Sequence, residues 1–224
     1  MPTKVNVVLI ASGGGTDADA IMAAYVNKFI PNIYLRALIS TKEGAGCLEK
    51  AANWNIQGIV VNRKKVRSEE EFNHLLADHL KELKCELVFL VGCIVKIYPI
   101  AGIAIYNIHP AEPNNFGGQG MYGLKVHERV IANVEDLINR GKKKITDDFF
   151  TYPTVHEAII EYDSGAPLLQ ASIKIPQRII IARLADQISL AQAAEYLQKY
   201  VLPYEWLMLP LAVRMAAQKI IDEN

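Results

Sequence analysis

The chain has 224 residues, of which 51% are hydrophobic, which suffices for one sizeable domain with a buried core and excludes intrinsic disorder as the default state. Lysine plus arginine and aspartate plus glutamate both number 24, so the formal net charge is zero. Such a balance gives no broad electrostatic footprint for nucleic acid or an anionic membrane, and it favours a small-molecule partner.

The N-terminal half alternates predicted strands and helices. Residues 5–11 form a β-branched run that ends in a glycine turn at 12–16, and residues 17–29 carry apolar side chains at helical spacing. Ser68 and Glu71 form a capping box at the start of a later helix. The same unit recurs along this half, with predicted strands at residues 33–40, 58–61 and 87–91 and predicted helices at residues 45–54 and 69–83.

The C-terminal half begins with a short predicted strand at residues 103–108, which leads into His109, Pro110 and a glycine-rich loop at 111–123. The tail at residues 189–221 is predicted to be helical and interrupted at Pro203. Between these segments we predict a helix at 124–140 and two strands, at 149–162 and 167–175, which flank a turn at 163–166 and form an antiparallel hairpin.

Strands that alternate with helices predict an α/β fold, with a mostly parallel sheet covered by helices on both faces. The hairpin adds an antiparallel C-terminal part. No linker, repeat or low-complexity tract divides the sequence, so residues 1–224 are predicted to form one domain. In such a fold, functional residues are expected beyond the carboxyl ends of the strands.

The cysteines and the N-terminus indicate the compartment. The three cysteines, Cys47, Cys85 and Cys93, form no C-x-x-C pair and leave an odd number, which is typical of reduced thiols and predicts no zinc site. Residues 1–4 and the short apolar run that follows are too short and wrongly flanked for a signal peptide or membrane span. We therefore expect a soluble cytoplasmic protein without a metal.

The glycine turn near the N-terminus has two interpretations. Gly13-x-Gly15-x-x-Ala18 satisfies the letter of the dinucleotide fingerprint, but the second strand is followed by no carboxylate before Glu43, so the ribose contact of that fingerprint is missing. The helix N-terminus can still hold a phosphate or carboxylate of a small ligand. The negative charge of Asp17 would repel a second anion at this turn. The alternative to a ligand-binding role is a tight turn with an aspartate cap.

Asn107 and His109 lie two apart at the end of a predicted strand, so both side chains point to the same side. An amide and an imidazole there offer a hydrogen-bond donor for a developing oxyanion and a group that titrates near neutral pH. Asp163, in a later turn, is a candidate to orient the imidazole or take its proton. A simple strand end and turn remains the alternative, and His156, within a predicted strand, is expected to be structural.

Taken together, the chemistry-bearing segments resemble the folate-dependent formyltransferases. The similarity spans about residues 5 to 215, and its most specific part is Asn-x-His-Pro at residues 107–110, followed by His156 and by Asp163-Ser164-Gly165. The segments that match the family in order and spacing are residues 11–16, 91–99, 107–110, 116–123, 155–156 and 163–165.

The resemblance implies a Rossmann-like formyltransferase fold and transfer of a formyl group from the co-substrate 10-formyltetrahydrofolate to the amine of glycinamide ribonucleotide, a step of de novo purine biosynthesis, without a metal or a covalent enzyme intermediate. Asn107 would donate to the formyl oxygen, His109 would act as electrophile and proton shuttle, and Asp163 would pair with His109 and help to remove the amine proton. We expect a monomer or homodimer that binds no nucleic acid and no membrane.

The resemblance also implies the binding residues and a division of the domain into a nucleotide- or phosphate-binding half, residues 1–105, and a catalytic and folate-binding half, residues 106–224. The folate would be held by Ile94, Val95, Lys96, Ile97, Ile159, Ile160 and Glu161. The acceptor would be held by Ser12, Gly13, Gly14, Gly15, Thr16, Asp17 and Glu205.

Several departures from the family pattern gather on the acceptor side. Asp17 stands where asparagine is usual, Trp206 replaces a histidine, and the segment 111–115 differs, as do Val95 and Lys96 on the folate side. An expansion lies between residues 132 and 153. These departures leave two alternatives open: a formyltransferase that acts on a different, non-phosphorylated amine, and a non-catalytic protein that binds folate or a nucleotide.

Overall fold

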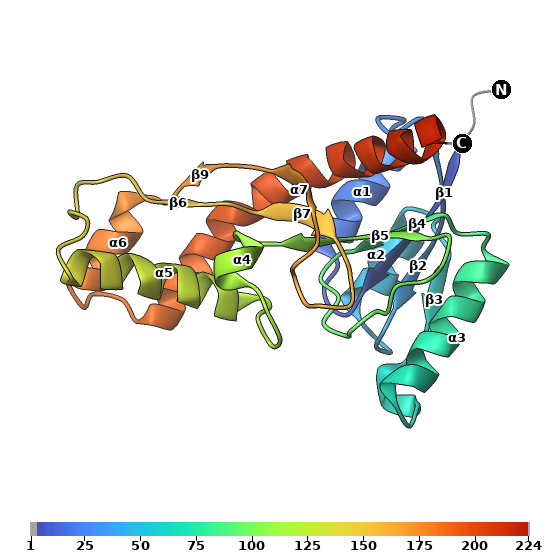
Figure 1. The fold of residues 1–224 in the computed structure, drawn as a ribbon, viewed down its shortest axis with the longest axis horizontal. Helices are drawn as coiled ribbons and strands as arrows, with labels where there is room; N and C mark the ends of the chain where they lie inside the picture. Colours follow the sequence, from blue (N-terminus) through green and yellow to red (C-terminus); the bar gives the residue numbers. More distant parts are fainter. Residues whose placement is uncertain (1–3, 224) are drawn as a thin grey trace.

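The structure is a computed structural model that describes residues 4–223. Residues 1–3, part of the N-terminus in which no signal peptide is predicted, lie outside this range. The main sheet has seven strands in the order β3-β2-β1-β4-β5-β7-β8 (Figure 1). These strands are β1 (Val5–Ala11), β2 (Ile33–Ser40), β3 (Gly58–Val60), β4 (Leu87–Leu90), β5 (Ala104–His109), β7 (Thr154–Glu157) and β8 (Pro167–Gln170).

Strands β1 to β5 pair in parallel, and β7 and β8 add to the β5 edge in antiparallel orientation. The predicted mostly parallel sheet with an antiparallel C-terminal hairpin is therefore confirmed. Four helices cover this sheet or its edges: α1 (Thr16–Val26), α2 (Gly46–Asn53), α3 (Glu69–Glu82) and α7 (Leu190–Glu223).

Alternate residues of β1 point to opposite faces of the sheet. Val7 and Leu9 pack in one core cluster with α1, α2 and the C-terminal part of α7, whereas Val8 and Ile10 pack in another with α3. Because both faces are buried, the strand is apolar at nearly every position rather than at alternate ones. Half of the predicted capping box at α3 forms, since the Ser68 hydroxyl accepts a hydrogen bond from the Glu71 N–H at 3.1 Å. The Glu71 carboxylate accepts its hydrogen bond from the Arg67 N–H, at 2.7 Å, one residue before the expected donor.

A third core lies away from the sheet, at the left of Figure 1, where α5 (Leu124–Asn139), α6 (Gln177–Leu184) and the N-terminal part of α7 pack together. A small antiparallel sheet of β6 (Phe150–Thr151) and β9 (Ile173–Lys174) completes it. Residues 132–153, where an expansion was predicted, supply the end of α5, the connection to β6 and β6 itself. The helix α6 and two short helices, η1 (Arg63–Lys65) and α4 (Pro113–Phe116), were not predicted.

The last helix corrects one prediction. Helix α7 continues through Pro203 and Pro210 as one element of 34 residues, whereas an interruption at Pro203 was predicted. Proline costs a helix about 3 kcal/mol, but Val201 before it packs in the third core and Leu209 after it packs against the sheet. Burial on both sides of Pro203 therefore keeps the helix continuous, and α7 joins the two parts of the molecule.

The predicted hairpin strands are also too long. The strand predicted at 149–162 divides into β6 and β7 and ends at Glu157, and the strand predicted at 167–175 divides into β8 and β9. Pro153 has no N–H to give to a sheet, and its carbonyl accepts a hydrogen bond from the Ala171 N–H at 3.1 Å. The chain changes sheets at this point, and residues 158–166 form a loop.

The start of α1 depends on one glycine. Gly15 has φ +73°, and a Cβ built on it would lie 2.5 Å from the Cys47 Cβ. We expect Gly15→Ala to lower the free energy of unfolding by about 2–4 kcal/mol, because left-handed backbone strain and a core clash add. Gly14→Ala is the matched control, since a Cβ there meets nothing within 4 Å. Equal urea midpoints for the two variants would contradict this account.

Candidate active site

A cleft of about 500 Å³ opens at the carboxyl ends of the parallel strands. Its lining comes from the turn after β1, the segment after β4, the end of β5, the loop before α5, the loop after β7 and the middle of α7. This is where the fold was expected to place functional residues. Segments from both halves of the sequence therefore form one site.

Asn107 and His109 both line this cleft, as their spacing on β5 predicts. The register of β5 against β7 places Asn107 directly opposite His156. The Asn107 Nδ2 consequently lies 3.4 Å from the His156 Nε2, and the His156 Nδ1 lies 2.8 Å from the Glu157 carbonyl oxygen. His156 was expected to be structural, yet it belongs to this polar cluster.

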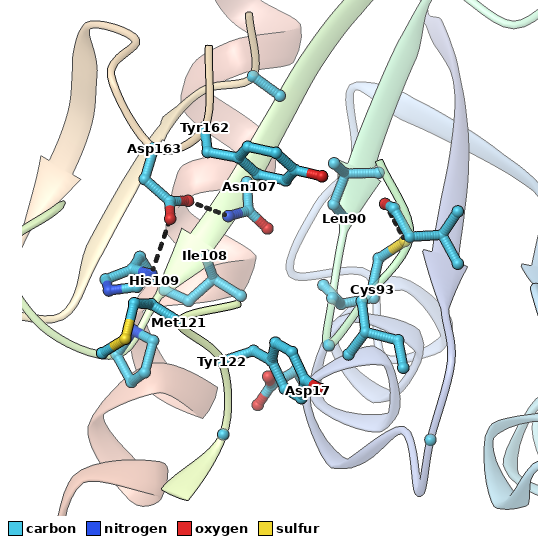
Figure 2. Close-up of a pocket in the computed structure, with 18 of the residues that line it drawn as sticks. Asp17, Leu90, Cys93, Asn107, Ile108, His109, Met121, Tyr122, Tyr162 and Asp163 are labelled. Atoms are coloured by element: carbon cyan, nitrogen blue, oxygen red, sulfur yellow. Dashed lines mark hydrogen bonds and ion pairs between the residues drawn. The ribbon is translucent and has the colours of Figure 1, made fainter. Parts of the chain in front are cut away.

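Asp163 is the centre of the cluster (Figure 2). One carboxylate oxygen, Oδ1, lies 3.4 Å from the Asn107 Nδ2 and 3.5 Å from the His156 Nε2. The other, Oδ2, lies 3.7 Å from the His109 Nδ1 and accepts a 3.0 Å hydrogen bond from the Gly118 N–H. The structure therefore brings together the three residues that were predicted to carry catalysis.

Two glycines, Gly117 and Gly165, allow Asp163 to lie close to the other members of the cluster. Asp163 itself has φ +53°, a conformation that aspartate tolerates better than most residues. A Cβ on Gly117 would lie 2.7 Å from the Asp163 Cβ, and a Cβ on Gly165 would lie 1.9 Å from the Glu157 carbonyl oxygen. Only glycine fits at residues 117 and 165 without a steric clash, which explains the glycine in Asp-x-Gly at 163–165.

The electrostatics of the cluster fix its protonation at neutral pH. Burial raises the pKa of Asp163. The hydrogen bonds from His156 and the Gly118 N–H, together with the electrostatic effect of His109 and His156, lower it by a larger amount, so its net pKa lies below the usual value. Burial lowers the pKa of His109 more than Asp163 raises it. The cluster thus presents a carboxylate, a neutral imidazole and an amide.

Two further lining residues have no catalytic proton chemistry at neutral pH. Burial raises the pKa of Cys93 to about 11, so its thiol stays protonated and is a poor nucleophile. Burial also lowers the pKa of His127 to about 4, and its Nδ1 has no hydrogen-bond partner among the described residues. Sequence reasoning missed His127 in this cleft because helical spacing alone does not show what α5 faces.

The residues expected to hold folate form one wall of the cleft. Ile94, Ile159 and Ile160 line it and are among the exposed large hydrophobic side chains, which is typical of a surface that a ligand covers. The Lys96 ammonium lies 5.0 Å from the centre of the Tyr162 ring. All seven expected residues line the cleft: Ile94, Val95, Lys96, Ile97, Ile159, Ile160 and Glu161.

The residues expected to hold the acceptor line another part of the cleft, with one exception. Ser12 is not in the lining, because its hydroxyl lies 2.7 Å from the Thr41 Oγ1 and accepts a 3.1 Å hydrogen bond from the Ile94 N–H. It ties together the chain segments that follow three strands. The remaining six do line the cleft: Gly13, Gly14, Gly15, Thr16, Asp17 and Glu205.

Glu205 is buried and Asp17 is half-buried, and the charges of their two carboxyl groups interact. Burial raises the pKa of Asp17 to about 6, although a hydrogen bond from Trp206 lowers it. Burial and the nearby Asp17 charge raise the pKa of Glu205 well above its usual value. Both carboxyl groups therefore take up protons at higher pH than exposed ones would, a property that spacing along the sequence does not show.

Within residues 4–223, no group of three or more histidine, cysteine, aspartate or glutamate side chains is arranged to hold a metal ion. The same part of the chain contains no helix with the length and apolar character needed to cross a bilayer.

Comparison with known proteins places the chain in a family. Residues 5–199 match the family model described as formyl transferase. A chloroplastic phosphoribosylglycinamide formyltransferase of Arabidopsis thaliana is 27% identical over 180 residues, covering 78% of this chain and 56% of that protein. A phosphoribosylglycinamide formyltransferase of Dictyostelium discoideum is 28% identical over 189 residues, covering 76% of this chain and 84% of that protein. The chain spans about half the length of the plant relatives it matches.

Solved structures show the same fold. The glycinamide ribonucleotide transformylase 1 of Symbiobacterium toebii superposes with a TM-score of 0.75 at 22% identity, covering 96% of this chain and 89% of that one. The phosphoribosylglycinamide formyltransferase of Brucella melitensis gives a TM-score of 0.70 at 26% identity, covering 96% of both chains.

Proposed function

We propose that this chain, which belongs to the formyl transferase family, transfers a formyl group from 10-formyltetrahydrofolate to the amine of glycinamide ribonucleotide, a reaction of purine biosynthesis. The observation that carries the proposal is the cluster of Asn107, His109 and Asp163 in a cleft that both halves of the chain line. The names of the relatives support the acceptor.

Each member of the cluster has a role in this reaction. When bound, 10-formyltetrahydrofolate supplies the formyl group. The Asn107 amide is placed to donate to the formyl oxygen as it gains negative charge, because its contacts to Asp163 and His156 are long at 3.4 Å and leave it able to turn to a stronger acceptor.

Proton transfer falls to Asp163 and His109. The Asp163 carboxylate accepts the proton that the amine loses as its nitrogen bonds to the formyl carbon, and returns it to the folate nitrogen as the old carbon–nitrogen bond breaks. The neutral His109 can donate from Nε2 to the Phe116 carbonyl oxygen, 3.2 Å away, and its Nδ1, 3.7 Å from the Asp163 Oδ2, can take up a proton beside that carboxylate. His109 is therefore assigned the role of a proton shuttle whose imidazolium Asp163 stabilises. An amine that attacks directly requires no enzyme nucleophile, in agreement with the protonated Cys93 thiol.

The two substrates are assigned to different parts of the cleft. The exposed apolar wall of Ile94, Ile159 and Ile160 fits a flat aromatic pterin, and the glycine turn at the start of α1 offers backbone N–H groups to an acceptor phosphate. Residues 1–105 would then supply the phosphate contacts and residues 106–224 catalysis, although the expected folate residues 94–97 lie in the first half.

Acceptor-dependent turnover tests the proposal. Purified protein is incubated with a stable 10-formyl folate analogue, and release of the deformylated pteridine is followed by absorbance with and without glycinamide ribonucleotide. We expect release that depends on the acceptor. Release without an acceptor would indicate hydrolysis, and folate binding without any release would contradict catalysis and favour a non-catalytic folate-binding protein.

A second acceptor class has a specific observation in its favour. Asp17 and Glu205 bring two carboxyl groups to the part of the cleft that would receive the phosphate. A phosphate-free amine would avoid their like charge. Glycinamide riboside, which differs from glycinamide ribonucleotide only in lacking the phosphate, belongs in the same assay as an alternative acceptor.

We also propose a cytoplasmic location. Cys47, Cys85 and Cys93 are all free thiols, which is typical of a reducing compartment. A monomer or homodimer remains our prediction.

A further inference from the structure

The carboxyl groups of Asp17 and Glu205, both expected to hold the acceptor, take no part in the proton transfers proposed above. Asp17 lies in the first turn of α1, and Glu205 lies in the middle of α7. Resting on the proposed function, we propose that Asp17 is a specificity-determining residue, and that a phosphorylated acceptor is bound only when the Asp17–Glu205 pair takes up a proton.

The geometry of the pair shows that it is built to receive a ligand. Glu205 is only 4% exposed, and both it and Asp17 line the cleft. Among the described residues, the Glu205 Oε1 and the Asp17 Oδ1 are buried without a hydrogen-bond partner. Buried polar atoms are normally paired, so two orphaned oxygens in one cleft indicate contacts that are made only with a bound molecule.

The surroundings supply little positive charge to the pair. Trp206, beside Glu205 on α7, donates a hydrogen bond to Asp17 and is neutral. Lys96 is the one lysine or arginine in the lining within residues 4–223, and it contacts Tyr98 and Tyr162 near the folate wall. The other titratable lining groups outside the Asp163 cluster are Cys93, Tyr122, His127, Glu161 and Tyr162.

Figure 2 shows Asp17 apart from the proposed reacting groups Asp163 and Asn107. Cys93 and His127 are neutral at pH 7 because of their shifted pKa values. The proton that compensates an incoming dianion must therefore come to Asp17 or Glu205 or to the phosphate itself. Once both carboxyl groups are protonated, each can donate a hydrogen bond instead of repelling the anion.

The expected change in KM on Asp17→Asn follows from the pKa of Asp17, which is about 6 in the free protein. Asp17 is protonated in about one molecule in ten at pH 7 and in about one in a hundred at pH 8. The apparent affinity for the ribonucleotide falls in proportion to this protonated fraction. We expect Asp17→Asn to lower the KM for glycinamide ribonucleotide about tenfold at pH 7 and about a hundredfold at pH 8. Below pH 5.5 the two proteins should be nearly equal.

The kinetic experiment compares glycinamide ribonucleotide with glycinamide riboside between pH 5.5 and 8.5. The sign is fixed, because protonation assists phosphate binding and so the wild-type KM for the ribonucleotide must rise with pH. The KM for the riboside should change little on Asp17→Asn. Asp19→Asn is the matched control, because it removes the same charge from α1. Asp19 accepts a hydrogen bond from the Trp54 Nε1 and does not line the cleft.

Proton uptake gives a readout that does not need catalysis. Titration calorimetry of glycinamide ribonucleotide at pH 7.5, in two buffers with different ionisation enthalpies, should show about one proton taken up by the wild type and by Asp19→Asn. Asp17→Asn should show almost none. Uptake by the phosphate itself would persist in Asp17→Asn, so equal uptake in the wild type and that variant would overturn the inference.

The remaining outcomes separate this inference from the proposed function. If the ribonucleotide binds with Asp17-dependent proton uptake but no formyl transfer occurs at any pH, the proposed activity fails and the inference stands. If transfer occurs with a KM that Asp17→Asn leaves unchanged, the activity stands and the inference fails. If the ribonucleotide binds neither the wild type at pH 5.5 nor Asp17→Asn, the inference is overturned.

Discussion

Asn107→Ala is expected to lower kcat about 10²- to 10³-fold while the affinity for folate stays within a few-fold. The Asn107 amide lies in the cleft beside Asp163 and His156, where a formyl oxygen that gains charge would find no equivalent donor after the substitution. Removing one donor of this kind costs catalysis rather than binding, because the interaction strengthens only as charge develops. Steady-state kinetics and a folate titration together measure both quantities.

Asn114→Ala is the control for this variant, because Asn114 is exposed in α4 and does not line the cleft. Its kinetics should match the wild type. Equal urea midpoints for Asn107→Ala and the wild type would show that the loss is not one of folding. Turnover by Asn107→Ala within threefold of the wild type would remove Asn107 from the mechanism.

The sequence predicts the sheet well because its pattern is local. Residues 5–11 are apolar at nearly every position, and that continuous run can be satisfied only by burial on both faces, as Val7, Leu9, Val8 and Ile10 show. The misplaced elements are those whose ends depend on distant partners. Pro203 does not end α7, because packing on both sides of it in different cores outweighs the local cost of proline.

The candidate site shows the same division. The spacing of Asn107 and His109 on one strand is enough to place both in the cleft. Asp163 was a candidate partner of His109 on chemical grounds and the family resemblance added its role, but nothing near it in sequence fixes where its loop folds back. His156 reaches the cluster through the antiparallel register opposite Asn107, and the burial of Glu205 beside Asp17 arises from the packing of α7 against α1. Neither the His156–Asn107 contact nor the burial of Glu205 can be predicted from the spacing of residues along the chain.

Asp163→Asn is expected to lower kcat/KM by about 10²- to 10⁴-fold, because an amide cannot accept the proton that the amine must lose. Asparagine also tolerates positive φ, so the φ of +53° at this position adds no new backbone strain. Asp78→Asn provides a control for the change in net charge, since Asp78 is exposed on α3. Activity of Asp163→Asn close to that of the wild type would exclude Asp163 as the proton acceptor.

The pH profile tests the pairing of Asp163 with His109. In the wild type the pKa of Asp163 lies below its usual value of 3.8 and that of His109 below 6.5. Both groups are therefore in their active forms above pH 6.5, and the acid limb of kcat/KM must lie below that value. In Asp163→Asn the pKa of His109 should fall further, because the carboxylate that raises it is lost. An acid limb that moves upward in this variant would show that the carboxylate was not the group that stabilised the imidazolium, and with it the proposed Asp163–His109 pairing would fail.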